Sequence, residues 1–232
     1  MSSKPNFQKA HNLASEILVC SKKINTFPFL VISVIEELTD IRILTYGQVE
    51  KKLGIPRTLW ESKDAEIKEQ NGMFIIFYNE QITDKHRMAF SVLHELGHYY
   101  LQHDMDYLTK LKHTNKEKFQ ETYSCYEVEA NYFAAQLLMP EQVISELIKK
   151  GKKITVDFLV STFNVSHQAA EFRKKYLCNY YERKTYSEEL SYDDIILMKF
   201  KTFIQKNCPK KDNNYYSREE EYEKQAERDK WQ

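Results

Sequence analysis

Residues 65–101 read AEIKEQNGMFIIFYNEQITDKHRMAFSVLHELGHYYL, and this stretch decides the fold class. Within it, Asn71-Gly72 separates two strand-like runs, and both residues tolerate the positive φ angles of a type I′ turn. We therefore predict a β-hairpin with arms at 65–70 and 73–78. The second arm, MFIIFY, is almost wholly apolar, so we expect it to be buried on at least one face.

A long helix follows the hairpin. Thr83 or Asp84 can accept hydrogen bonds from the first backbone amides of a helix that runs to about Leu101. The chain contains only five glycines and five prolines, and helical spacing predominates elsewhere. We expect further helices at 12–22, 28–38, 121–139, 140–149, 156–163 and 166–177, a strand at 41–46, and a polar, mobile stretch at 103–118. The predicted fold class is α+β, mostly helical, with a small antiparallel or mixed sheet.

Charge and apolar patterning exclude several classes of protein. Basic and acidic side chains number 34 each, so no global charge favours a nucleic-acid coat or a membrane-surface protein. The first ten residues lack the apolar segment of a signal peptide, and the apolar run at 27–35 is too short to span a bilayer. The four cysteines are scattered and indicate neither a zinc ribbon nor a disulfide framework. We predict a cytoplasmic protein with no membrane association.

The sequence His94-Glu-Leu-Gly-His98 carries the chemistry. On a helix, positions i and i+4 differ by about 40° around the axis, so both imidazoles project from one face and can bind one Zn²⁺. Glu95 lies beside them and can accept a proton from water that the metal activates. The alternative is a surface helix with two incidental histidines. The flanking residues favour the metal site, because apolar side chains cluster on a different face of the same helix, at Ala89, Val92, Leu93, Leu96 and Tyr100.

A catalytic zinc site needs a third protein ligand and one open position for water. The next long helix offers Glu121, Glu127 and Glu129. Glu127 shares its face with small residues that would let two helices approach closely, whereas Glu129 points about 160° away. We therefore predict Glu127 as the third ligand and Asn131, one turn on, as a hydrogen-bond partner of a ligand imidazole. The alternative for Glu127 is an ordinary solvated carboxylate.

Other polar and aromatic residues near the motif each have two interpretations. We interpret His86, His103 and His113 as solvated surface or loop histidines, with an extra ligand or a transition-state donor as the alternative. Tyr99 and Tyr100 are expected to pack, and the group that stabilises the oxyanion stays unassigned. Residues 157–177 resemble a helix-turn-helix, with His167, Gln168, Arg173 and Lys174 polar on its second helix. Because the chain has no net charge to attract phosphates, we favour a small helical lobe over direct DNA binding.

Taken together, His94-Glu-Leu-Gly-His98 and EVEANYFAAQLLMP at 127–140 resemble the ImmA/IrrE family of zinc metallopeptidases, which are gluzincin-like. The Asn-Gly hairpin and Asn79 after it add to this resemblance. It implies zinc ligands at His94, His98 and Glu127, with Glu95 as the catalytic base. The chain then divides into a zincin-like metallopeptidase domain at 1–150, with a pair of active-site helices beside the sheet, a helix-turn-helix-like lobe at 151–180, and a polar C-terminal tail, helical or disordered, at 181–232.

The resemblance also implies a substrate. Members of the family typically cleave a helix-turn-helix transcriptional repressor, here of the XRE type, and so act in transcription regulation. The expected function is a zinc-dependent endopeptidase of such a repressor, with Mn²⁺ as an alternative ion. The rival function is a non-hydrolytic, metal-bound antirepressor or DNA-binding regulator. The sequence does not indicate the oligomeric state.

Overall fold

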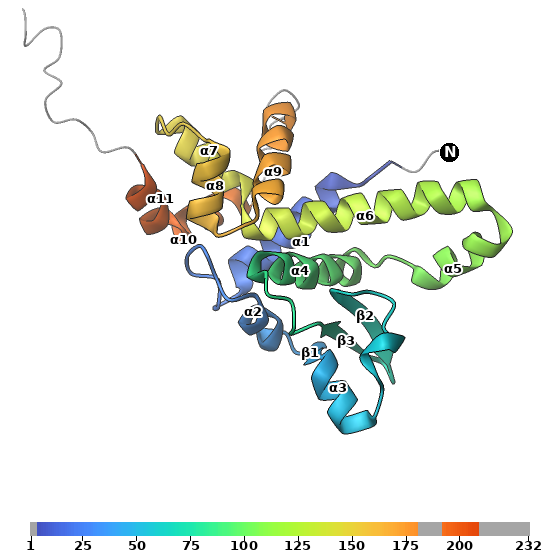
Figure 1. Ribbon diagram of the computed structural model, residues 1–232. Coiled ribbons are helices and arrows are strands. Elements are labelled where there is room, and N and C mark those ends of the chain that lie inside the picture. The colour runs from blue at the N-terminus through green and yellow to red at the C-terminus, as the bar shows by residue number, and fades with distance from the viewer. Residues whose placement is uncertain (1–3, 181–191, 209–232) are drawn as a thin grey trace, which may run out of the picture.

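The computed structural model describes residues 4–180 and 192–208. Within these ranges the chain forms one three-stranded sheet, eleven α-helices and a short 3-10 turn (Figure 1). This mostly helical architecture with a small mixed sheet confirms the predicted α+β class. In the same ranges no helix combines the length and the apolar character that a membrane crossing requires.

The sheet contains β1 (Ile41–Thr45), β2 (Ala65–Gln70) and β3 (Met73–Tyr78) in the order β1-β3-β2. β3 pairs parallel with β1 and antiparallel with β2, so it is the central strand, which accounts for its continuous apolar sequence. The turn between β2 and β3 has φ of 53° at Asn71 and 78° at Gly72. The hairpin is therefore confirmed, and β2 is left as an edge strand of this sheet.

The remaining described elements are helical. They are α1 (Phe7–Cys20), α2 (Val31–Glu37), α3 (Tyr46–Leu53), η1 (Arg57–Leu59), α4 (Lys85–Leu101), α5 (Met105–Thr114), α6 (Lys116–Leu138), α7 (Glu141–Lys149), α8 (Val156–Phe163), α9 (His167–Tyr180), α10 (Tyr192–Lys199) and α11 (Lys201–Asn207). α4 lies between the sheet and α6, and α6 in turn packs on α1 (Figure 1). The motif helix is thus covered on two sides.

The interface between α4 and α6 is unusually close at one point. A Cβ atom at Gly97 would lie 3.1 Å from the Ala130 Cα and 3.2 Å from the Ala130 carbonyl oxygen. Leu93, Leu96 and Phe133 are fully buried around this point, and each such side chain stabilises the fold by about 1.5–3 kcal/mol. Small residues on both helices therefore permit the close approach that the α6 alanines predicted.

The stretch at 103–118 was predicted to be polar and mobile, and this prediction is wrong. Residues 105–114 form α5, whose N-cap Asp104 accepts a hydrogen bond from the Tyr107 amide at 2.7 Å. Leu108 and Leu111 are buried against the body of the protein. Two leucines among charged residues give a weak periodic signal, so only the tertiary contact distinguishes this helix from a loop. The short helix α3 was missed for the same reason.

Part of the expected polar tail, residues 192–208, is helical and packs against the rest of the protein. Residues 192–208 form α10 and α11, and their buried side chains Ile196, Phe200, Phe203 and Ile204 join the main core. Residues 181–191 and 209–232 of the expected tail lie outside the described residues. The division into three domains stays a prediction.

The helix-turn-helix-like pair α8–α9 turns at Asn164, which has a left-handed φ of 54°. Arg173 of α9 was expected on a polar face, and this prediction is wrong. Its side chain is 2% exposed, and its Nε donates to the Met139 carbonyl oxygen at 2.9 Å. Arg173 fastens α9 to the end of α6 and is not available to DNA.

Candidate metal centre

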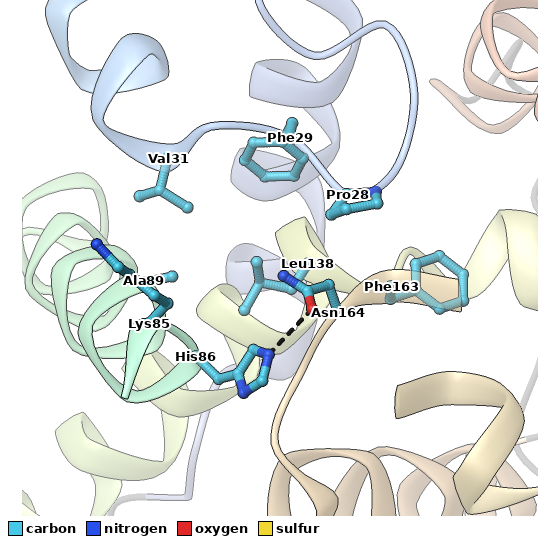
Figure 2. Close-up of a pocket in the computed structure, with 9 residues that line it drawn as sticks. All are labelled: Pro28, Phe29, Val31, Lys85, His86, Ala89, Leu138, Phe163 and Asn164. Carbon is cyan, nitrogen blue, oxygen red and sulfur yellow. Dashed lines mark hydrogen bonds between the residues drawn. The ribbon is translucent and has the colours of Figure 1, made fainter. Parts of the chain in front are cut away.

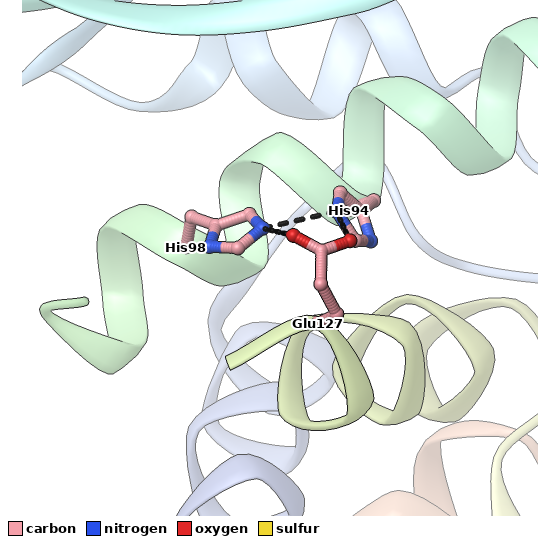
Figure 3. A group of neighbouring side chains, drawn as sticks. All are labelled: His94, His98 and Glu127. Carbon is pink, nitrogen blue, oxygen red and sulfur yellow. Dashed lines mark hydrogen bonds and ion pairs between the residues drawn. The ribbon is translucent and has the colours of Figure 1, made fainter. Parts of the chain in front are cut away.

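α4 presents the two histidines of the motif to α6. The Asp84 carboxylate accepts hydrogen bonds from the amides of His86 at 2.9 Å and Arg87 at 3.2 Å, so the helix begins where the capping pattern predicts. One turn of this helix separates His94 from His98, and their Nε2 atoms lie 2.9 Å apart (Figure 3). Two nitrogen lone pairs at this distance repel each other unless a proton or a cation lies between them.

Glu127 of α6 completes the group. Its Oε2 lies 3.5 Å from His94 Nε2 and its Oε1 lies 3.5 Å from His98 Nε2, so the carboxylate faces both imidazoles (Figure 3). One ligand atom from each of the three residues lies within 4.8 Å of the others. Among the described residues they are the only three His, Cys, Asp or Glu side chains that meet this geometry. Two imidazole nitrogens and one carboxylate oxygen are a donor set that Zn²⁺ prefers, so these residues fit a divalent cation.

The charges of the three side chains are strongly coupled. Burial lowers the pKa of His94, but the carboxylates of Glu127 and Glu95 raise it by more, so the net shift is upward. Burial outweighs the Glu127 interaction at His98 and lowers its pKa. Burial raises the pKa of Glu127, but its contacts with His94 and His98 lower it by more, so the net pKa lies well below the usual range. The Glu127 carboxylate thus faces two imidazole nitrogens, and a divalent cation bound between the three side chains would offset its charge.

The structure brings Asn131 to His94, where the sequence predicted a supporting residue. The His94 Nδ1–H donates to the Asn131 Oδ1 at 3.0 Å. This contact leaves the Nε2 lone pair of His94 directed toward Glu127. The roles of His94, His98, Glu127 and Asn131 in metal binding stay predictions, although their side chains lie together as expected.

His103 was interpreted as a solvated loop histidine, and this interpretation is wrong. Its side chain is 2% exposed, its Nδ1 lies 2.8 Å from His98 Nδ1, and its Nε2 lies 2.9 Å from the Glu129 Oε2. Glu129, rejected as a ligand because it points away from Glu127, is the buried partner of this histidine. The only sequence signal was that His103 follows His98 by five residues, which does not show where its ring lies.

The two remaining histidines near the motif lie apart from it. His86 is at the start of α4, where its Nε2 contacts the Asn164 Oδ1 at 3.0 Å beside a small pocket of about 50 Å³ (Figure 2). Pro28, Phe29 and Phe163 are among the apolar side chains that line this pocket. His113 is exposed in the last turn of α5. Neither is within the ligand group.

Glu95 is partly buried on the side of α4 that faces the edge strand β2. Its Oε2 accepts a hydrogen bond from the Ile67 amide of β2 at 3.0 Å. Burial raises the pKa of Glu95 to about 7, and the hydrogen bond and the charge of His94 only partly offset this effect. A carboxyl group with such a pKa can accept or donate a proton near neutral pH.

A cleft of about 610 Å³ runs beside the same edge strand. β2 lines it with Ile67, Lys68 and Glu69, while the end of α4 contributes His98 and Tyr99. Tyr99 is held in place because its hydroxyl hydrogen-bonds to Asp40 and its ring packs on Phe74 at 4.8 Å. His98 is the member of the His-His-Glu group that lines the cleft, so the cleft connects this histidine to the edge strand β2, an arrangement suited to an extended polypeptide.

Comparison with known proteins adds one match. A peptidase family model described as IrrE N-terminal-like domain matches residues 56–175, more than half of the chain. The matched region includes the hairpin, α4 and α6, and thus every residue of the candidate site. No curated protein matches the chain.

Proposed function

The chain belongs to the peptidase family of the IrrE N-terminal-like domain, a metallopeptidase-type family, and from this premise we propose that it is a zinc-dependent endopeptidase. The observation that carries the proposal is the convergence of His94 Nε2, His98 Nε2 and the Glu127 carboxylate next to the partly buried Glu95. Three protein ligands leave a position open for water, as in catalytic rather than structural zinc sites.

When bound, a divalent cation would act as a Lewis acid and lower the pKa of a coordinated water. His94, His98 and Glu127 would hold it from one side. Zn²⁺ is the ion that best suits this mixture of nitrogen and oxygen donors, and Mn²⁺ is the alternative.

Glu95 would serve as the general base. Its buried carboxyl group has a pKa of about 7, and a nearby positive charge favours the carboxylate that must accept the proton. The Ile67 amide holds the Oε2 atom in place. After the water attacks the peptide carbonyl, Glu95 would pass the proton to the leaving amine.

The open edge of β2 supports the proposal that the substrate is a polypeptide. Ile67 faces Ile76 of β3 in the register, but its amide is directed to Glu95 and away from β3, so it lies on the open edge of β2. An extended chain laid along this edge would place its peptide groups beside the ligand group. The family suggests the identity of that chain, namely an XRE-type helix-turn-helix repressor in the cytoplasm, without direct DNA binding by the peptidase.

The proposal is tested with the full chain, Zn²⁺ and a helix-turn-helix repressor encoded beside its gene. Mass spectrometry of the mixture should show two fragments whose masses together equal that of the repressor plus one water, as peptide-bond hydrolysis requires. Glu95→Gln should bind the metal and leave the repressor intact, because the ligands remain and the base is lost. An intact repressor after long incubation with the metal-loaded chain would favour the antirepressor alternative, and cleavage by the metal-loaded Glu95→Gln chain would refute the role of Glu95.

A further inference from the structure

His98 has a second ring nitrogen, Nδ1, and the groups bound to it are not used in the proposed mechanism. His98 Nδ1 lies 2.8 Å from His103 Nδ1, and His103 Nε2 lies 2.9 Å from Glu129 Oε2. The other carboxylate oxygen of Glu129 accepts the Asn6 amide at 2.5 Å. His103 and Glu129, which we call the supporting pair, therefore connect His98 to a buried carboxylate and to the start of α1.

The backbone directs His103 back toward His98. At the end of α4, Gln102 adopts the left-handed conformation with φ of 58°, and the His103 amide donates to the His98 carbonyl oxygen at 3.1 Å. The Tyr126 ring of α6 stacks on the His103 ring, with centroids 4.1 Å apart and planes 2° from parallel. The position and the tilt of the His103 ring are thus fixed from both helices.

The hydrogen bonds of the supporting pair define which nitrogen of each ring carries hydrogen. A carboxylate only accepts, so His103 Nε2 carries the hydrogen that lies between His103 and Glu129. In the neutral ring, His103 Nδ1 then has a lone pair and accepts from His98 Nδ1–H. His98 Nε2 is left with its lone pair, and this atom is the one that faces Glu127. The pair thereby selects the tautomer of His98 that a metal ion requires.

We propose that His103 and Glu129 position His98 and strengthen its Nε2 as a ligand of a divalent cation, and that His103 is not itself a ligand. This inference rests on the proposed metal centre. A carboxylate behind a chain of two imidazoles increases the electron density on the outer nitrogen, as carboxylates do for histidine ligands in general. The two ligands differ in this respect, because His94 is supported by the exposed amide of Asn131.

The experiment measures metal binding by the full chain, two variants of the supporting pair and one control variant, without any substrate. His103→Phe keeps a planar ring against Tyr126 but removes both hydrogen bonds. Glu129→Gln keeps the histidine and removes the charge. His113→Phe is the matched control, because it makes the same substitution at an exposed position in α5. Zn²⁺ affinity is measured by competition with a chromophoric chelator, and the absorption bands of bound Co²⁺ report the ligand set.

We expect His103→Phe to bind Zn²⁺ about 10–100-fold more weakly than the unchanged chain, with Glu129→Gln between the two and His113→Phe unchanged. The Co²⁺ bands should keep their positions in all variants that bind it, because the three ligands are the same. Circular dichroism identifies a variant that fails to fold, in which case Glu129→Gln decides the question.

Two results would overturn the inference while leaving the proposed function in place. Folded variants that bind Zn²⁺ within twofold of the unchanged chain would show that the supporting pair does not act on His98. Co²⁺ bands that shift as for a lost nitrogen ligand in His103→Phe would make His103 a ligand. An unchanged chain that binds neither ion would overturn the proposed function and this inference together.

Discussion

Replacing Glu95 by glutamine should stabilise the protein after its metal has been removed with a chelator. Glu95 is partly buried, and the loss of solvent raises its pKa from 4.5 to about 7. A carboxyl group whose pKa is higher in the folded state binds its proton more tightly there, so the free energy of unfolding falls as pH rises from 4.5 to 7 and then stays low. The shift corresponds to about 3 kcal/mol above pH 7, because one pKa unit is about 1.4 kcal/mol. Glutamine does not ionise and escapes this loss.

The assay is urea unfolding of the chelator-treated chain and variant, followed by circular dichroism. At pH 8 the free energy of unfolding of Glu95→Gln should exceed that of the unchanged chain by about 3 kcal/mol, and at pH 5 by only about 1 kcal/mol. Glu69→Gln is the control, since Glu69 is an exposed carboxylate on β2, the strand whose Ile67 amide contacts Glu95. Equal stability at pH 8, or an equal gain at both pH values, would refute the burial of an ionisable Glu95.

Three further predictions test the site and the core. Glu127 and Glu95 raise the pKa of His94 above 6.5, so protons should compete with Zn²⁺ for this imidazole already near neutral pH. Competition with a chelator should therefore show that the Zn²⁺ affinity falls steadily as the pH drops from 8 to 6. A Zn²⁺ affinity independent of pH would argue against His94 as a ligand. Gly97→Ala places a Cβ 3.1 Å from the Ala130 Cα and should lower the free energy of unfolding by about 1–3 kcal/mol in denaturant titration, whereas a neutral effect would mean that α4 and α6 are less closely packed. Phe200→Ala empties a fully buried position of the main core and should cost about 3–5 kcal/mol by the same measurement, while a cost near zero would return residues 192–208 to the status of a tail.

The parts of the fold that were predicted from the sequence depend on neighbours along the chain. Asn71-Gly72 predicts its own turn, because only positive φ angles close a two-residue hairpin with the correct twist. Asp84 predicts the start of α4, because its side chain caps amides two and three residues ahead. Even the position of Glu127 opposite His94 and His98 followed from helical periodicity and from the small residues that share its face.

The predictions that were wrong concern the burial of polar side chains, which depends on segments far away in the sequence. Arg173 and His103 are polar, and polarity alone predicts exposure. In the structure both side chains are buried with hydrogen-bond partners. Arg173 donates to the carbonyl oxygen of Met139, and His103 donates to the carboxylate of Glu129. These partners lie 34 and 26 residues away, and no local pattern indicates that they would meet.

The sequence by itself therefore determined which three side chains converge on the candidate metal centre and that Glu95 lies beside them, because a helix fixes the direction of residues one turn apart. Only the tertiary structure decided what surrounds them: the supporting pair behind His98, the edge of β2 at Glu95, and the inclusion of α10 and α11 in the core. The physical reason is that burial and hydrogen bonding are properties of contacts between distant segments, and their free energies depend on packing that the local sequence does not specify.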